Sequence, residues 1–130
     1  MGRRDEAIER DRWLGLVGAL PGTYVHRCEP MVNAHHVRAL PNGFPDVLFY
    51  AEGKVVPVEW KRGGKRPGTL SEDQLRVHAA MAEGGVTVLM AYTAGDCCRD
   101  LAARFGGATA ERLFRCAELL DNKKVAADCK

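Results

Sequence analysis

The stretch DVLFYAEGKVVPVEWK, residues 46–61, decides the fold of this chain. Two runs within it, 46–50 and 55–60, are rich in β-branched and aromatic residues and flank a turn-like segment at 52–54. This pattern predicts a β-hairpin. Pro57 lies inside the second run and removes one backbone donor from it, which is unusual for a central strand.

Helical and extended patterns surround this hairpin on both sides. Apolar residues recur at helical spacing over 4–20, and an extended pattern follows at 23–28. After the hairpin, a helix is expected over 71–83, and the nearly continuous apolar run at 86–92 predicts a buried strand. The remaining expected elements are helices near 96–105 and 109–120 and loops at 29–44 and 63–68.

The expected order is αβββαβ, followed by one or two further helices. A helix that joins two strands of one sheet implies a right-handed crossover and a mixed sheet. A chain of 130 residues has the size of one domain. We therefore expect a single α/β domain over residues 1–130, with helices flanking a central mixed β-sheet.

The composition excludes several classes of protein. With 46% hydrophobic and 28% charged residues, the chain is typical of a globular protein rather than a disordered or fibrous one. No apolar run is long enough for a membrane-spanning helix, and no apolar leader opens the sequence. We expect a cytoplasmic protein, in the host cytoplasm if it is phage-encoded. The five cysteines include no C-x-x-C pair, so we expect reduced thiols rather than a disulfide framework or a zinc site.

Positive charge is concentrated in one segment of a nearly neutral chain. Residues 53–67 contain five basic residues and one acidic residue, a net charge of +4, whereas the whole chain has +2. Such a patch fits an anionic partner such as DNA, although a solvated loop is the alternative. Phosphate contacts would supply affinity and register without reading bases. The candidates are Arg27, Arg38, Arg62, Lys65 and Arg66.

Three charged residues of the hairpin are candidates for catalysis. Glu59 and Lys61 lie two apart on a predicted strand and share a face. Asp46 opens the preceding strand, so antiparallel pairing could bring it near Glu59. Two carboxylates beside an ammonium group suit Mg²⁺ and an activated water. The same spacing also fits a cross-strand ion pair without catalytic meaning.

Four motifs occur in order along the chain: GFPD at 43–46, VEWK at 58–61, LSEDQ at 70–74 and GGV at 84–86. In this order they resemble the VRR-NUC nucleases of the PD-(D/E)xK, restriction-endonuclease-like superfamily. The resemblance is clearest over residues 43–93, and it implies a restriction-endonuclease-like core. It also implies Mg²⁺ or Mn²⁺ as cofactor.

Transferred to matching positions, the resemblance implies a specific metal centre. Asp46 and Glu59 would be metal ligands, the Trp60 backbone carbonyl a further ligand, and Lys61 the catalytic lysine. The first helix would add an acid near the metal, for which we choose Glu9 over its neighbour at position 6. A solvated acid on an amphipathic helix is the alternative.

Two residues of the helix at 71–83 are further candidates. The resemblance implies that Gln74 lies beside the site, although Ser71 and Gln74 also match a capping box. His78 follows one turn later on the same face. It could contact DNA phosphate, or it could be a packed or solvated histidine.

Together these observations predict a metal-dependent DNA endonuclease that hydrolyses phosphodiester bonds in branched DNA such as Holliday junctions. The alternatives are a sequence-specific restriction or homing-type nuclease of the same fold, and a catalytically silent nucleic-acid-binding module. The resemblance also implies a homodimer. Its interface, or equally the core, could be formed by Leu101, Phe105, Leu113, Phe114, Leu119 and Leu120.

Overall fold

The expected order of helices and strands is present in the computed structural model, which describes residues 2–28, 42–64 and 68–122. Most of the predicted loop at 29–44 lies outside these residues, and the structure otherwise confirms the α/β class. The elements are α1 (Gly2–Val17), β1 (Thr23–Arg27), β2 (Val47–Ala51), β3 (Lys54–Trp60), α2 (Glu72–Glu83), β4 (Leu89–Ala91), α3 (Ala94–Arg104) and α4 (Gly107–Asp121).

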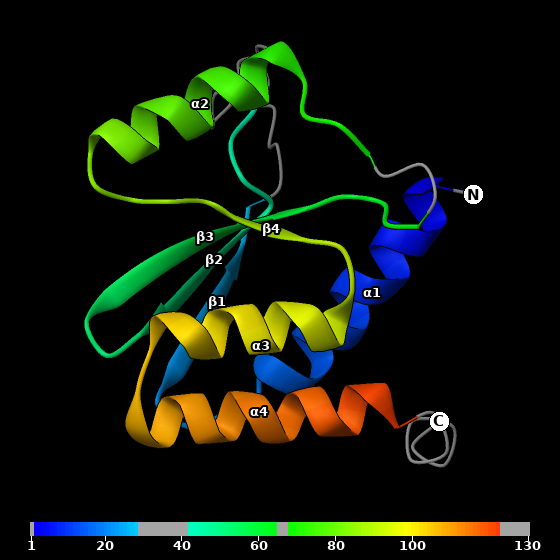
Figure 1. The fold of residues 1–130 in the computed structure, drawn as a ribbon, viewed down its shortest axis with the longest axis vertical. Coiled ribbons are helices and arrows are strands. Elements are labelled where there is room, and N and C mark those ends of the chain that lie inside the picture. Colours follow the sequence, from blue (N-terminus) through cyan, green and yellow to red (C-terminus); the bar gives the residue numbers. More distant parts are fainter. Residues whose placement is uncertain (1, 29–41, 65–67, 123–130) are drawn as a thin grey trace, which may run out of the picture.

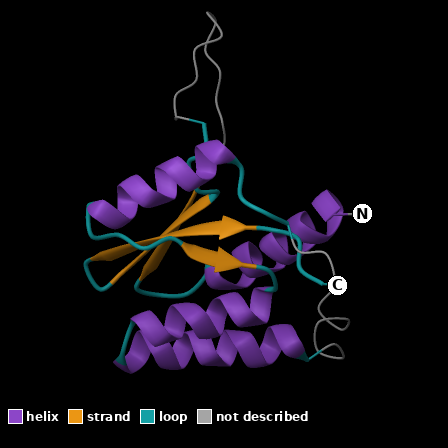
Figure 2. Cartoon of the chain, turned by 45° about the horizontal axis from the view of Figure 1, so that its top comes forward, coloured by secondary structure: helices purple, strands orange, loops and turns teal. Residues whose placement is uncertain are grey.

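The sheet is mixed, as expected. Its strand order is β1-β2-β3-β4, with antiparallel pairing of β1 with β2 and of β2 with β3, and parallel pairing of β3 with β4. The crossover between the two parallel strands contains α2. Figures 1 and 2 show α2 on one side of the sheet and the antiparallel pair α3 and α4 on the other.

One face of the sheet forms the hydrophobic core with α1, α3 and α4. The register places Val47 opposite Val58 and Phe49 opposite Val56, and all four side chains are buried. Trp13 of α1 packs across this face, with its ring centroid 6.3 Å from that of Phe49 and 5.8 Å from that of Trp60.

The C-terminal helices contribute mainly to this core. Leu101, Phe105, Leu113 and Leu120 are buried in it, so they are core residues rather than an exposed interface. Phe114 and Leu119 are the residues of that set that remain exposed, at 48% and 45%. Among the described residues, no helix combines the length and the apolar character needed to cross a membrane.

Strand β4 is shorter than the predicted run at 86–92, and Pro57 explains why. Lys61 donates its N–H to the Ala91 oxygen at 2.9 Å, so alternate residues of β3 face β4. Pro57 also occupies a position that faces β4, but it has no N–H to donate to the Thr87 oxygen. The Arg104 guanidinium donates to the Thr87 oxygen instead, and β4 pairing begins at Leu89.

Candidate functional site

Asp46 lies at the edge of the sheet where β1 ends, β2 begins and β3 ends. It precedes β2 by one residue and follows the fully buried Pro45. Its Oδ2 accepts a hydrogen bond from the Trp60 N–H at 2.8 Å, and its backbone oxygen accepts one from the Cys28 N–H at 2.8 Å. The backbone of β3 therefore holds the Asp46 carboxylate in place.

Glu59 is a buried acid on the face of β3 opposite the core. Only 1% of it is exposed, whereas its neighbours Val58 and Trp60 point into the core. Burial raises the Glu59 pKa to about 9, helped by a hydrogen bond from its carboxyl group to Asp46 and by the negative charge of Asp46. Without a bound cation, Glu59 therefore carries a proton at neutral pH. The predicted meeting of Asp46 and Glu59 is confirmed.

His78 of α2 contacts the Glu59 carboxyl group. Its Nε2 lies 3.2 Å from Glu59 Oε1, and the His78 side chain is 14% exposed. Burial lowers the His78 pKa, and the nearby charge of Lys61 lowers it further. With the pKa of Glu59 raised and that of His78 lowered, the two groups form a neutral hydrogen-bonded pair near pH 7. His78 therefore packs against a carboxyl group of the protein. This position favours the alternative of a packed histidine over a contact with DNA phosphate.

Lys61 is the basic residue of this cluster. It directly follows β3, and its positive charge lowers the pKa values of both Glu59 and His78, so it lies close to each of them. The next segment folds back beside it: Gly68 donates its N–H to the Arg62 oxygen at 2.8 Å. A Cβ at Gly68 would lie 3.3 Å from Lys61 Cδ, so a side chain at position 68 would crowd Lys61.

Gln74 has the capping role that its spacing from Ser71 suggests. The Ser71 N–H donates to Gln74 Oε1 at 2.9 Å, and the Gln74 N–H donates to Ser71 Oγ at 3.1 Å. These two bonds begin α2. The amide oxygen of Gln74 is therefore used at the helix start, and a catalytic role for this residue stays a prediction.

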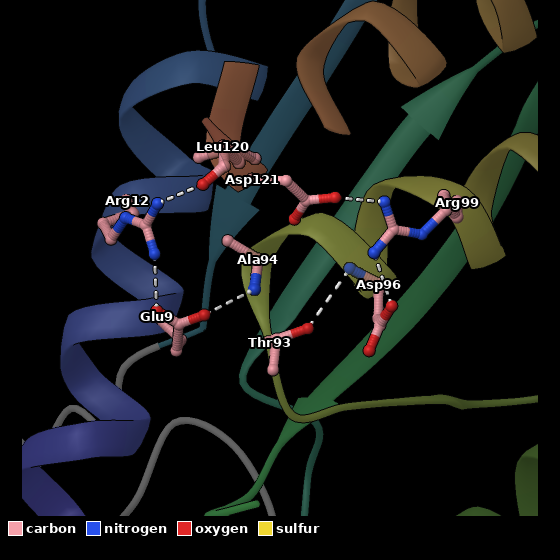
Figure 3. A network of polar contacts seen from close by, with 8 residues as sticks. All are labelled: Glu9, Arg12, Thr93, Ala94, Asp96, Arg99, Leu120 and Asp121. Atoms are coloured by element: carbon pink, nitrogen blue, oxygen red, sulfur yellow. Dashed lines mark hydrogen bonds and ion pairs between the residues drawn. The ribbon is translucent and has the colours of Figure 1, made fainter. Parts of the chain in front are cut away.

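The structure gives Glu9 a different role from the predicted one (Figure 3). Its Oε1 accepts the Ala94 N–H at 3.0 Å, at the start of α3, and its Oε2 pairs with Arg12 at 2.8 Å. Arg12 also donates to the Leu120 oxygen of α4. Both carboxylate oxygens of Glu9 thus tie α1 to its neighbouring helices, which favours a structural role.

Glu6, one turn earlier on α1, is the acid whose charge reaches the cluster. Its negative charge contributes to raising the Glu59 pKa. We therefore favour Glu6 over Glu9 as the α1 acid whose charge acts on Glu59, and a metal-ligand role for an acid of α1 stays a prediction. The sequence contained one signal for this choice, because Arg12 follows Glu9 at the spacing of a helical ion pair.

The candidate DNA contacts are only partly described. Arg27 ends β1 on an exposed position, and Arg62 follows Lys61. Arg38, Lys65 and Arg66 lie outside the described residues. Tyr92, which sequence reasoning missed, directly follows β4 and is 37% exposed. A Cβ at position 63, a glycine, would lie 3.3 Å from Tyr92 Cβ, so Tyr92 adjoins the loop after Lys61.

The donors in this cluster fit a hard cation. Within residues 2–28, 42–64 and 68–122, no group of three or more His, Cys, Asp and Glu side chains is arranged to hold a metal ion. The fully buried Glu59 instead has its carboxyl group hydrogen-bonded to that of Asp46. A divalent cation favours the ionised form of nearby acids, and carboxylate and carbonyl oxygens are the ligands that Mg²⁺ prefers.

Comparisons of the chain with protein-family models, with curated proteins and with solved structures gave no match.

Proposed function

We propose that this chain is a metal-dependent DNA endonuclease with a restriction-endonuclease-like fold of the VRR-NUC type. One observation carries the proposal: the carboxyl groups of Asp46 and Glu59 are hydrogen-bonded to each other, one of them fully buried, with Lys61 close by. Burying a carboxyl pair is costly unless a charge partner compensates. A bound cation is the charge partner that best compensates such a pair of carboxyl groups.

Asp46 and Glu59 would hold Mg²⁺ or Mn²⁺, with the Trp60 carbonyl as a further donor. When bound, the ion would polarise a phosphoryl oxygen and lower the pKa of a water. The Trp60 N–H fixes the Asp46 carboxylate, so the ligand needs little rearrangement. Lys61 supplies a positive charge where negative charge develops on the phosphate.

The remaining residues position these groups. His78 contacts Glu59 Oε1 and limits the orientations of that carboxyl group. The capping box of Gln74 fixes the start of α2, and His78 lies one turn further along this helix. Disturbing α2 would therefore change the orientation of Glu59 without removing a ligand.

Branched DNA, cut by a homodimer, remains the substrate that we propose. The basic segment 53–67 contains Lys61 and supports binding to a phosphate backbone. The exposed Leu119 of α4 is available for contact with a second copy. Free thiols at Cys28, Cys97, Cys98 and Cys116 fit a reducing, cytoplasmic setting.

Cleavage of a labelled four-way junction, compared with its matched linear duplex, tests the proposal. The wild type, Asp46→Asn and Lys61→Ala are assayed with Mg²⁺, Mn²⁺ or EDTA. Arg115→Ala is the matched control, because Arg115 is an exposed basic residue of α4 outside the basic segment 53–67.

We expect metal-dependent cleavage of the junction by the wild type and by Arg115→Ala, and loss of cleavage in Asp46→Asn and Lys61→Ala with DNA binding retained. Preferred cleavage of the linear duplex at one sequence would indicate a restriction or homing-type nuclease instead. DNA binding without cleavage under any metal would contradict the catalytic proposal and favour a binding module.

A further inference from the structure

A row of exposed aromatic side chains lies on the sheet at β1 and β2. Tyr24 is directly opposite Tyr50 in the register, and their ring centroids are 5.7 Å apart. The His26 ring lies 6.4 Å from that of Tyr24 on the same strand. Tyr24 is 59% exposed and Tyr50 is 40% exposed. These three residues, Tyr24, His26 and Tyr50, are the aromatic row.

The aromatic row shares a sheet face with Glu59. Tyr50 is opposite Val55 in the β2–β3 register, and Val55 and Glu59 are separated by an even number of residues on β3. Side chains at even spacing point to the same face of a strand. Four residues at ~3.3 Å each place Glu59 about 13 Å from Val55. The aromatic row and the carboxyl cluster are therefore two parts of one surface.

Helix α2 leaves this part of the surface open. His78 of α2 reaches Glu59 on β3, whereas the rings on β1 and β2 stay exposed among the described residues. A hollow at this end of the sheet is lined by Thr23, Tyr24, Tyr50 and Val55, together with the turn at 51–54. The rings thus border a recess that a flat molecule could enter.

The chemistry of the aromatic row fits unpaired nucleic-acid bases. Aromatic rings stack on bases of any sequence, because every base has a π-face. Sheets with aromatic residues on adjacent strands bind two or three bases in this way. Leu48, Val55 and Pro57, which separate the aromatic row from Glu59 on this face, are uncharged. The hollow beside the rings is lined by one acid, Glu52, and one base, Lys54, so it has no net charge of its own that would repel a phosphate chain.

Resting on the proposed nuclease function, we infer that the aromatic row binds a single-stranded tail that leaves the duplex near the cleaved bond. A continuous duplex keeps its bases stacked on each other, so the aromatic row binds DNA with unpaired nucleotides in preference to a continuous duplex. Val55, opposite Tyr50 in the register, is about 13 Å from Glu59 along β3. At ~3.4 Å per nucleotide, this distance corresponds to about four nucleotides. Within the proposed class of branched DNA, the preferred substrate is therefore one with an unpaired arm, which should bind more tightly than a fully paired junction.

Binding in EDTA measures this interaction without cleavage. A blunt duplex and the same duplex with tails of increasing length are titrated with the full chain. Three variants are compared with the wild type: the double variant Tyr24→Ala/Tyr50→Ala, the ring-preserving Tyr24→Phe/Tyr50→Phe, and Phe114→Ala. Phe114 is an equally exposed aromatic residue on α4 and is the matched control.

We expect the double alanine variant to lose about tenfold or more in affinity for tailed DNA and little for the blunt duplex. The phenylalanine and Phe114→Ala variants keep the wild-type affinity. The gain from a tail should appear only when the tail reaches about four nucleotides. An equal loss on the blunt duplex, or no loss on tailed DNA, overturns the inference.

A probe in the DNA makes the test independent of the variants. A 2-aminopurine base near the fourth tail nucleotide loses fluorescence when it stacks on a ring, so binding of the wild type should quench it. Unchanged fluorescence in the bound complex overturns the inference. Quenching without metal-dependent cleavage would support the base-binding role of the aromatic row and contradict the proposed nuclease function. Cleavage of tailed DNA without quenching would support the nuclease function and contradict the base-binding role.

Discussion

The two faces of the sheet are covered to very different degrees. On one face, α3 and α4 bury residues along their whole length, among them Leu101 and Leu113. On the other face, α2 spans 12 residues and buries none of them. The fully buried acid Glu59 lies under this lightly packed helix. The core face therefore supplies most of the stability, and the α2 face can hold groups that are costly to bury.

Two leucine substitutions should show the largest difference between the faces. Leu113→Ala removes a fully buried side chain of α4 and should lower the free energy of unfolding by about 2–5 kcal/mol. Leu75→Ala removes a side chain of α2 that is 55% exposed and should change it by about 0.5 kcal/mol or less. Urea denaturation of both variants measures this. Equal losses would show that α2 packs as tightly as α4.

The α2 face should also lose stability as the pH rises. The Glu59 pKa is about 9 in the folded protein against an ordinary value of 4.5, so the folded state binds more protons between these values. Stability is then full below about pH 4.5 and falls toward pH 9, by at most ~1.4 kcal/mol per pH unit. Denaturation in metal-free buffer between about pH 7 and about pH 8.5 avoids the titration of His78, whose pKa is lowered.

Glu59→Gln should flatten this pH dependence, because an amide does not titrate. Glu52→Gln is the matched control, since Glu52 is an exposed acid in the turn before β3. It should keep the wild-type slope. Identical slopes in the wild type and in Glu59→Gln would contradict the raised pKa and the role of the carboxyl pair.

Substitutions of the two acids of α1 should have effects of intermediate size. Glu9→Ala removes the acceptor of the Ala94 N–H and the partner of Arg12, which should cost about 1–3 kcal/mol of stability. Glu6→Ala removes a negative charge that acts on Glu59, so it should cost less stability and weaken Mn²⁺ binding more. Thermal denaturation and Mn²⁺ titration of both variants separate these roles. The opposite ranking would restore Glu9 as the site acid.

Helix caps should give the smallest effect. Ser71 caps α2 and Thr93 caps α3, each through its hydroxyl group, and either alanine variant should lose about 1 kcal/mol in its own helix. Thr93→Ala should lower global stability, because α3 is part of the core. Ser71→Ala should instead speed amide hydrogen exchange within α2 alone. Equal global losses would contradict the independence of α2.

Local patterns were sufficient to predict most of the elements. The hairpin, the capped start of α2 and the mixed sheet follow from periodicity and turn residues within short windows of sequence. The approach of Asp46 to Glu59 also follows, because antiparallel register determines it. The shortness of β4 did not follow, since it depends on the alignment of Pro57 with Thr87 across a crossover.

Relationships between distant elements could not be predicted in this way. Whether Glu6 or Glu9 meets the carboxyl cluster depends on how α1 crosses the start of α3 at Ala94. Exposure of Tyr24 and Tyr50 depends on where α2 lies over the sheet. Both are properties of packing, and no spacing within one segment of sequence encodes them.

The cation site can be tested by binding of Mn²⁺ to the protein without DNA. We expect one ion per chain, with binding lost in Asp46→Asn and in Glu59→Gln and kept in the control Glu52→Gln. Calorimetry or the electron spin resonance of free Mn²⁺ reports the bound fraction. Equal binding by all four proteins, or no binding by the wild type, would contradict the claim that the buried carboxyl pair is a cation site.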